Sequence, residues 1–276
     1  MYFRKRTDLP KVFGEGSWVI VAGSTDSIGY EFCLQLAAQG FNLVMLGRNA
    51  QKLKEKSAEV KKQTPKVQIQ TIVCEFTHDT TYGFYEDLIN QVAAENVSML
   101  YNCVGNYCGT LKDESLETIR DCLVTNVFPA TFLARAFIYK FKASETEKKA
   151  IVSIGCHSSE LEKVEDTTFN SAKRGIQMFN EGENCYYESK GQYLFTIMPV
   201  GIVTKKNGKK QDFLTCTPKE LVTDSLGSLG QIDVTFGCKR FIAYGHISEL
   251  IRNWFGNTMA SKWKNWTLDL AAKHPY

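Results

Sequence analysis

The chain has 276 residues, a length that suits one large α/β domain or two small ones. Its apolar fraction of 43% and its aromatic fraction of 12% provide for a sizeable core and exclude an intrinsically disordered chain. The net charge of only +3 gives no reason to expect nucleic acid or an acidic partner, so a solvated surface of mixed charge is predicted.

Short apolar runs alternate with helical periodicity along the chain. Asn49 is the expected N-cap of one helix, and Thr217 begins a capping box with Glu220 at the start of another. In chain order, we predict a strand over 18–23, a helix over 28–40, a strand over 41–47, a helix over 49–60, a strand over 67–76, a helix over roughly 80–95, a strand over 97–105, a helix over about 114–142, a strand over 150–155, a helix over about 168–189, a strand over 192–201, a helix over 217 to about 229 and a strand over 238–245.

This alternation, with strands that are apolar throughout, predicts a parallel sheet covered on both faces. The right-handed crossover rule then favours an α/β fold of the Rossmann type, a single domain with a doubly wound parallel sheet of about seven strands. We expect an N-terminal arm over 1–13, a main domain over 14–245 and a helical, aromatic-rich extension over 246–276.

The extension carries four large aromatic residues among lysines, namely Trp254, Phe255, Trp263 and Trp266. Such a segment either packs against its own domain or lies on a membrane surface or a protein partner.

Nine scattered cysteines without a Cys-x-x-Cys pair indicate an intracellular, reducing compartment. No signal peptide or membrane-spanning helix is predicted. Nor is a metal site predicted, because the four histidines are far apart: His78, His157, His246 and His274.

The stretch VAGSTDSIG (21–29) follows the first predicted strand and opens the first helix. Gly23, Ser27 and Gly29 have the spacing of a turn that binds the pyrophosphate of a dinucleotide with backbone N–H groups and a helix N-terminus. This makes 14–245 a candidate dinucleotide-binding domain. Ser27 stands where such turns usually have glycine, and its Cβ is expected to crowd the ligand. A plain strand-to-helix turn without a ligand is the alternative.

The second predicted strand ends at Gly47-Arg48-Asn49. A basic residue at this point accommodates the 2′-phosphate of NADP(H), whereas an acidic residue would bind the ribose of NAD. Arg48 therefore favours NADP(H), with a solvated loop arginine as the alternative.

Five segments, in this order and spacing, resemble the short-chain dehydrogenase/reductases: GSWVIVAGSTDSIG, LVMLGRNAQKL, YNCVG, VTNVF and IVSIGC…FNSAK. The branch they resemble holds the 17β-hydroxysteroid dehydrogenases and very-long-chain 3-ketoacyl-CoA reductases, which bind NADP(H) and reduce a ketone. The resemblance runs from about Gly14 to Tyr244. It implies a cofactor-binding set made up of Gly23, Ser24, Ser27, Ile28, Gly29, Arg48, Glu75, Asn102, Gly105, Lys173, Pro199 and Gly201.

The family's catalytic set is a tyrosine, a lysine four residues after it, a serine thirteen residues before it and an asparagine on the preceding long helix. Asn126 and Lys173 match the asparagine and the lysine. Phe169 stands at the tyrosine position and Cys156 at the serine position. In this respect the chain resembles the inactive hydroxysteroid dehydrogenase-like proteins. It also departs from the family pattern outside this set, at Ala22, Ser27, Glu75 and Cys103.

Ketone reduction needs a hydride, which the cofactor brings, and a proton for the developing alkoxide. In the family the tyrosine supplies this proton, its pKa lowered by the lysine, and the serine holds the oxygen. Phe169 has no proton to give, and the thiol of Cys156 is a weak hydrogen-bond donor. The loss of a positioned acid costs about 10²–10⁴-fold in rate.

Three alternatives to the lost tyrosine are available in the sequence. Tyr186 and Lys190 also match Tyr-x-x-x-Lys, but they lead into the start of a strand, whereas ligands bind at the carboxyl ends. His157 or Ser158 is a candidate substitute acid. A nucleophile built from Cys156 and His157 is disfavoured, because adjacent residues of a strand point to opposite faces.

These residues predict a protein that keeps NADP(H) but no longer performs ordinary dehydrogenase chemistry. Its role would be structural or accessory, as a homo-oligomer or as a subunit of a larger assembly at a mitochondrial or endoplasmic-reticulum membrane. One alternative is a working NADP-dependent reductase of a steroid or 3-ketoacyl ketone with a substitute proton donor. The other is a fold that has lost the cofactor as well.

Overall fold

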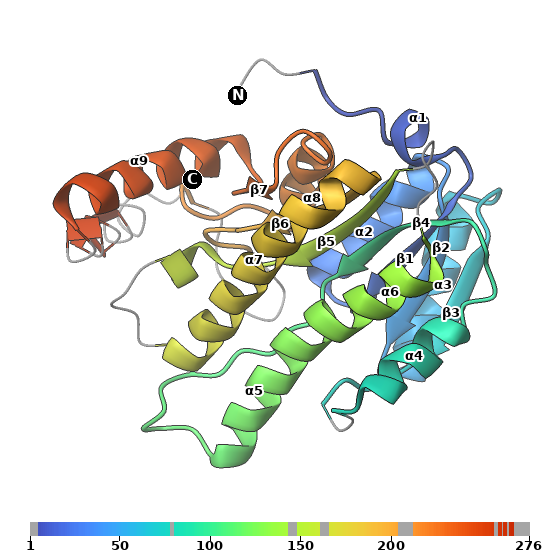
Figure 1. Ribbon diagram of the computed structural model, residues 1–276, viewed down its shortest axis with the longest axis horizontal. Helices are drawn as coiled ribbons and strands as arrows, with labels where there is room; N and C mark the ends of the chain where they lie inside the picture. Colours follow the sequence, from blue (N-terminus) through green and yellow to red (C-terminus); the bar gives the residue numbers. More distant parts are fainter. Residues whose placement is uncertain are drawn as a thin grey trace.

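In the computed structural model, residues 5–77, 80–142, 148–160, 166–203, 212–256, 259–260, 262–263 and 265–267 are described. Their strands form one sheet in the order β3-β2-β1-β4-β5-β6-β7, and every pairing is parallel. This is the predicted doubly wound Rossmann-type sheet (Figure 1). The strands are β1 (Trp18–Ala22), β2 (Asn42–Gly47), β3 (Ile69–Val73), β4 (Val97–Asn102), β5 (Lys149–Ile154), β6 (Gln192–Ile197) and β7 (Val234–Thr235).

Helices cover both faces of the sheet, as predicted. Successive side chains of β1 alternate between two hydrophobic cores, since strand residues point to opposite faces. Val19 and Val21 enter the core beneath α2, α3 and α8, whereas Ile20 and Ala22 enter the core beneath α4 and α6. The helices are α1 (Leu9–Phe13), α2 (Ser27–Ala38), α3 (Ala50–Gln63), α4 (Tyr82–Asn90), α5 (Leu116–Phe128), α6 (Ala134–Lys140), α7 (Thr167–Tyr187), α8 (Pro218–Leu226) and α9 (Lys239–Phe255).

The predicted caps are present. Asn49 Oδ1 accepts a hydrogen bond of 2.8 Å from Lys52 N at the start of α3, and Thr217 and Glu220 form the capping box of α8. The long helix predicted over 114–142 is interrupted by a π-helical turn over Pro129–Leu133, between α5 and α6. Proline lacks the backbone N–H that an α-helical bond needs, which explains the wider turn at this position.

The helical run Leu116–Lys140 is, among the described residues, the one helix long and apolar enough to cross a membrane by length and composition alone. More than half of its most apolar 18-residue window is buried inside the protein, and Leu133 and Phe137 lie in the core. It therefore has the character of a core helix.

The strand predicted over 238–245 is wrong, because this segment begins α9. The seventh strand is the two-residue β7 just before it, and Gly237, with φ of 79°, lies in the short connection from β7 to α9. In α9 the buried residues Phe241, Tyr244 and Ser248 recur at helical spacing, so a short apolar run concealed a helical period. The helix crosses the boundary expected at 245/246 without a break.

The N-terminal arm also contributes to the core. Leu9 and Phe13 of α1 are buried, and the Phe13 ring lies edge-on to Tyr193 with 6.4 Å between centroids. The domain expected to begin at residue 14 thus has part of its core from the segment before it.

Candidate functional site

The turn between β1 and α2 needs glycine at two positions. A Cβ on Gly29 would lie 2.2 Å from Gly23 O, and a Cβ on Gly23, whose φ is 75°, would lie 2.9 Å from Cys103 O. The turn is therefore packed against the chain that leaves β4. Ser24 is fully buried, and its hydroxyl donates to Leu46 O at 2.9 Å, which joins the turn to β2.

The N-terminus of α2 has no side-chain cap among the described residues. Asp26 is the N-cap, but its side chain makes no capping hydrogen bond. Its carboxylate instead forms an ion pair with Lys52, with Nζ 2.9 Å from Oδ1. Within the part of the chain that the structure describes, the first N–H groups of α2 thus have no side-chain acceptor, as at helix ends that bind phosphate groups. Ser27 begins the helix half-exposed, while Ile28 packs against the core.

Arg48 extends from the end of β2 with 76% of its side chain exposed. Its Nη1 lies 3.7 Å from Glu75 Oε2, which follows β3. Burial would raise the pKa of Glu75, but hydrogen bonds from Thr77, together with Arg48, outweigh it and lower this pKa. The guanidinium fits a 2′-phosphate, and the carboxylate beside it competes for the same cation.

Near the carboxyl end of β4, two buried side-chain amide oxygens have no hydrogen-bond partner among the described residues. They are Asn102 Oδ1 and Asn126 Oδ1. Buried acceptors are normally satisfied, so this site fits a ligand with hydroxyl or amide donors, such as a nucleotide cofactor. A Cβ on Gly105 would lie 2.9 Å from Asn126 Oδ1 and 3.2 Å from Lys173 Nζ, so glycine leaves the space in which these groups approach.

Asn126 and Lys173 are held by the backbone around this space. Asn126 Nδ2 donates to Asn106 O at 2.7 Å and to Cys122 O at 2.8 Å. Lys173 is 5% exposed, and its Nζ donates to Ile154 O at the end of β5 at 2.8 Å. Burial lowers the pKa of Lys173 to about 8, against the smaller opposing effect of neighbouring thiols. α5 and α7 thus bring both retained members of the expected catalytic set to one place.

Phe169 lies one helical turn before Lys173 and presents a ring where the family has a phenol. Lys173 Nζ lies 5.6 Å from the centroid of this ring. Tyr107, in the loop after β4, also packs against Phe169, with 5.5 Å between the two ring centroids. The retained lysine therefore faces an apolar ring.

The thiol of Cys156 belongs to a small polar network at the end of β5. Its Sγ lies 2.9 Å from Ser158 Oγ, and Ser158 Oγ donates to Asn170 Oδ1. A hydroxyl has one proton, so the thiol must be the donor to Ser158. Cys156 and Ser158, a predicted substitute acid, are thereby engaged with each other and with α7.

Tyr107 is a residue of this site that sequence reasoning missed. Its phenol donates to Asp166 at the start of α7, and this hydrogen bond, with burial, raises the pKa of Tyr107 to about 12. No motif marks the residue, and only its position shortly after a strand of the sheet could have drawn attention to it.

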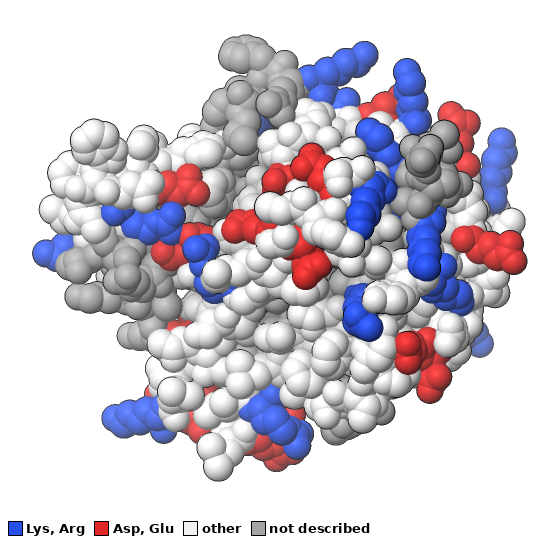
Figure 2. Space-filling model, in the orientation of Figure 1, with Lys and Arg blue, Asp and Glu red and all other residues white. Residues whose placement is uncertain are grey.

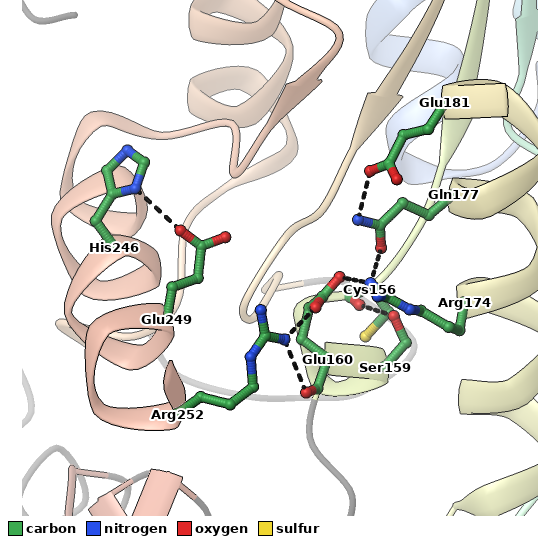
Figure 3. Close-up of polar contacts among 9 residues, drawn as sticks. All are labelled: Cys156, Ser159, Glu160, Arg174, Gln177, Glu181, His246, Glu249 and Arg252. Atoms are coloured by element: carbon green, nitrogen blue, oxygen red, sulfur yellow. Dashed lines mark hydrogen bonds and ion pairs between the residues drawn. The ribbon is translucent and has the colours of Figure 1, made fainter. Parts of the chain in front are cut away.

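Glu160, at the end of the short helical turn that follows Cys156, was also missed by sequence reasoning. It is mostly buried and forms ion pairs with Arg174 of α7 and Arg252 of α9 (Figure 3). Arg252 Nη1 also donates to Glu160 O at 3.2 Å. A residue close to Cys156 is thus bound to the C-terminal extension.

His157 lies on the core side of its segment. Its ring is edge-on to those of Phe236 and Tyr244, with centroid distances of 5.3 and 5.5 Å. The backbone N of His157 donates a hydrogen bond of 3.0 Å to Pro199 O. The buried ring thus packs in the aromatic core. Cys156 and His157 follow the end of β5, and His157 begins a 3-10 helical turn, so the alternation of strand residues used to disfavour their pairing does not apply to them. Pro199 and Gly201 follow β6, and Gly201 O accepts from Cys216 N at 3.0 Å.

Two other predictions concern residues outside this site. Tyr186 is exposed at the end of α7. Lys190, which lies just before β6, has its Nζ 3.4 Å from the centroid of the Tyr186 ring. No group of three or more potential metal ligands occurs in the described part of the chain, from which His78 and His274 are missing. All nine cysteines are free thiols.

Comparison with known proteins places this geometry in a family. Residues 17–214 match the short chain dehydrogenase family. The chain is 26% identical to 17-beta-hydroxysteroid dehydrogenase type 3 of Danio rerio over 89% of its length and 81% of that protein. It is also 26% identical to a very-long-chain 3-oxoacyl-CoA reductase of Caenorhabditis briggsae, over 83% of this chain and 73% of the relative.

A solved short-chain dehydrogenase from Sphingobium yanoikuyae, in complex with NADPH, has the same fold. The TM-score is 0.72 at 20% identity, with 86% of this chain and 96% of the other covered.

Proposed function

Since the chain belongs to the short-chain dehydrogenase family, we propose that it is a catalytically impaired member that binds NADP(H) and serves a structural or accessory role. The observation that carries this proposal is the ring of Phe169 under the ammonium of Lys173, at the position where the family has its proton donor. The family's reaction is an oxidoreduction, and its relatives are named as dehydrogenases and reductases.

The chemistry of the site supports the loss of catalysis. A nicotinamide cofactor, when bound, supplies the hydride. This chain's residues would have to hold the carbonyl oxygen and give it a proton, and the two positions that do so hold Phe169 and Cys156. The thiol proton of Cys156 is directed to Ser158. Neither group is therefore available as a positioned acid.

Three features of the site support NADP(H) binding. The N-terminus of α2, at Ser27, fits a pyrophosphate, and Arg48 fits a 2′-phosphate. The unpaired oxygens of Asn102 and Asn126 and the space at Gly105 fit the donors of a nucleotide. A bound nucleotide would stabilise the fold by mass action, which is a sufficient reason for an inactive protein to retain the site.

The accessory role follows from the same reasoning. A protein that binds its cofactor without turnover can act through its surface, as a homo-oligomer or as a subunit of a larger assembly. Exposed apolar residues on α5 and α9, among them Leu116 and Trp254, are available for such contacts. An intracellular, reducing location suits nine free thiols.

The test is a calorimetric titration with NADPH and NADH, followed by an assay of NADPH oxidation with the same preparation and steroid or 3-ketoacyl substrates. We expect binding, a preference for NADPH and no turnover above background. Turnover at ordinary enzyme rates would overturn the loss of catalysis. No binding at millimolar nucleotide would overturn the cofactor assignment.

A second candidate function is a slow NADP-dependent reductase of a steroid or 3-ketoacyl ketone. Its support is Tyr107, whose phenol stands beside Phe169 and is bonded to Asp166, a group that could return a proton to it. The raised pKa of Tyr107, about 12, makes it a weak acid at neutral pH, so this candidate ranks second.

A further inference from the structure

An open cavity of about 350 Å³ lies where α6 and α7 end and β6 begins. Its volume falls within the range of small-molecule sites, about 300–1,000 Å³. The polar and aromatic residues that line it are Tyr139, Lys142, Tyr186, Tyr187, Lys190 and Gln192. In Figure 2 basic side chains lie over this end of α6 and α7, which Figure 1 shows in the same orientation.

The cavity is separate from the candidate nucleotide site. Gln192 is the first residue of β6, whereas the nucleotide site lies at the carboxyl ends of the strands. Because all strands are parallel, the two places lie at opposite edges of the sheet. The length of β6 alone, at about 3.3 Å per residue, separates them by roughly 16 Å. The cavity is therefore a site of its own.

The floor of the cavity holds an unsatisfied polar group. Gln192 is 8% exposed, and its Oε1 has no hydrogen-bond partner among the described residues. Its partner in the sheet, Lys149, directs Nζ to Val97 O at 3.0 Å instead. Buried acceptors are normally paired, so this oxygen requires a donor from a ligand. The amide nitrogen beside it is a donor, so the group as a whole matches the edge of a nucleobase.

Tyrosine rings form the walls of the cavity. The rings of Tyr186 and Tyr187 lie edge to face, with 4.9 Å between centroids, and Tyr139 lines the cavity from α6. Tyr186 is 59% exposed and Tyr139 57%. Exposed aromatic rings of this kind are platforms on which planar bases stack.

Two lysines give the cavity its charge. Lys190 Nζ lies 3.4 Å from the centroid of the Tyr186 ring, and Lys142 lines the cavity just after α6. Among the described residues, no carboxylate lines the cavity and neither lysine forms an ion pair. The cavity therefore favours an anion. The Tyr-x-x-x-Lys spacing of Tyr186 and Lys190, which has no place in the catalytic set, places a ring and a cation together here.

We propose that this cavity binds a nucleoside monophosphate, in addition to NADP(H) at the carboxyl ends of the strands. The base packs against the tyrosine rings and meets the amide of Gln192 with its edge. The phosphate is held by Lys190 and Lys142. A phosphate ion lacks the ring, and a neutral aromatic molecule lacks the anion, so a nucleotide is the class that uses all three features.

The test is a calorimetric titration of the native chain with AMP in millimolar NADPH, which occupies the other site. AMP should bind. Ribose 5-phosphate, which lacks the base, and adenosine, which lacks the phosphate, should each bind at least about tenfold more weakly. If the chain binds no NADPH, the titration still reports on this cavity, so the two assignments fail separately.

Site variants show where AMP binds. Lys190→Ala and Gln192→Met each remove one contact and should weaken AMP binding at least about tenfold. The matched control is Lys56→Ala, because Lys56 Nζ also lies over a ring, 4.3 Å from the centroid of Tyr30, but does not line the cavity. This control should bind AMP as the native chain does. In urea denaturation without AMP, Gln192→Met should be at least as stable as the native chain, because an unpaired oxygen leaves the interior.

Five results would each overturn the proposal. AMP does not bind at millimolar concentration, or NADPH abolishes its binding and so assigns AMP to the NADP(H) site. Ribose 5-phosphate binds as tightly as AMP, which assigns the cavity to phosphate alone. Lys190→Ala weakens AMP binding no more than Lys56→Ala does. Gln192→Met is less stable than the native chain, which assigns the amide to the fold.

Discussion

The Nζ atom of Lys173 lies 5.6 Å from the centroid of the Phe169 ring, one turn away on α7. In the family this spacing lets a lysine lower the pKa of a catalytic tyrosine. Here the ammonium faces the ring of a residue that has no proton to give. Such a cation–π contact is worth about 0.5–1 kcal/mol at exposed sites and about 2 kcal/mol where the cation is buried, as Lys173 is. The helix thus keeps the geometry of the reaction while the acid is absent.

The burial of Lys173 predicts a particular dependence of stability on pH. Its pKa is about 8 in the folded protein, against 10.5 when unperturbed. Between these values the unfolded chain binds more protons, so the contribution of Lys173 to the free energy of unfolding rises with pH. In urea denaturation, the free energy of unfolding of the native chain, relative to that of Lys173→Met, should rise by about 1–3 kcal/mol between about pH 7 and pH 10. A difference that stays constant would show that the ammonium is not buried.

Arg48 and Glu75 predict the choice of nucleotide. Arg48→Ala should weaken NADPH binding about tenfold and leave NADH binding nearly unchanged, because only NADPH has a 2′-phosphate. The pKa of Glu75 is lowered, so its carboxylate is charged at neutral pH and competes for Arg48. Glu75→Gln should therefore strengthen NADPH binding. If calorimetry shows that Arg48→Ala loses affinity for NADPH and NADH to the same extent, this assignment is contradicted.

The ion pairs of Glu160 predict a loss of stability in Glu160→Gln. The carboxylate is mostly buried between Arg174 and Arg252, so the substitution should lower the free energy of unfolding by about 1–3 kcal/mol. Glu249→Gln removes a more exposed contact, the pair of Glu249 with His246, and should change the free energy of unfolding by less than about 0.5 kcal/mol. Similar values for the two variants in guanidinium denaturation would mean that α9 is not anchored through Glu160.

Tyr107 predicts how the two candidate functions separate. If the phenol has no catalytic role, Tyr107→Phe should leave the NADPH consumption of the native chain at background. The same substitution removes the hydrogen bond to Asp166, so circular dichroism must show that α7 persists. A measurable native rate that Tyr107→Phe abolishes would instead support the slow reductase.

The sheet and its covering helices were predictable because their signals are local. Apolar strands, the cap at Asn49 and the box at Thr217 each occupy a few consecutive residues, and each is present in the structure. The strand predicted over 238–245 failed for the same reason. Its apolar run is short enough to suit either period, and the contacts that decide for a helix, such as Tyr244 on His157, come from distant residues.

The candidate site was predictable only where a family pattern marks it. Asn126, Lys173, Phe169 and Cys156 were named from the resemblance to a known family, and the structure brings them to the carboxyl ends of β4 and β5. Tyr107, Glu160 and the pairing of Arg48 with Glu75 belong to no motif. Their roles arise from contacts between segments far apart in the chain, which spacing along the sequence does not report.

The measurement that tests the central claim most directly compares NADPH oxidation by the native chain and by the variant Phe169→Tyr, Cys156→Ser, with the same steroid and 3-ketoacyl substrates. The account predicts no native rate above background and a variant rate higher by about 10²-fold or more, since the phenol would be placed beside Lys173. Each single variant should recover less. Native turnover that the double variant does not increase would contradict the account.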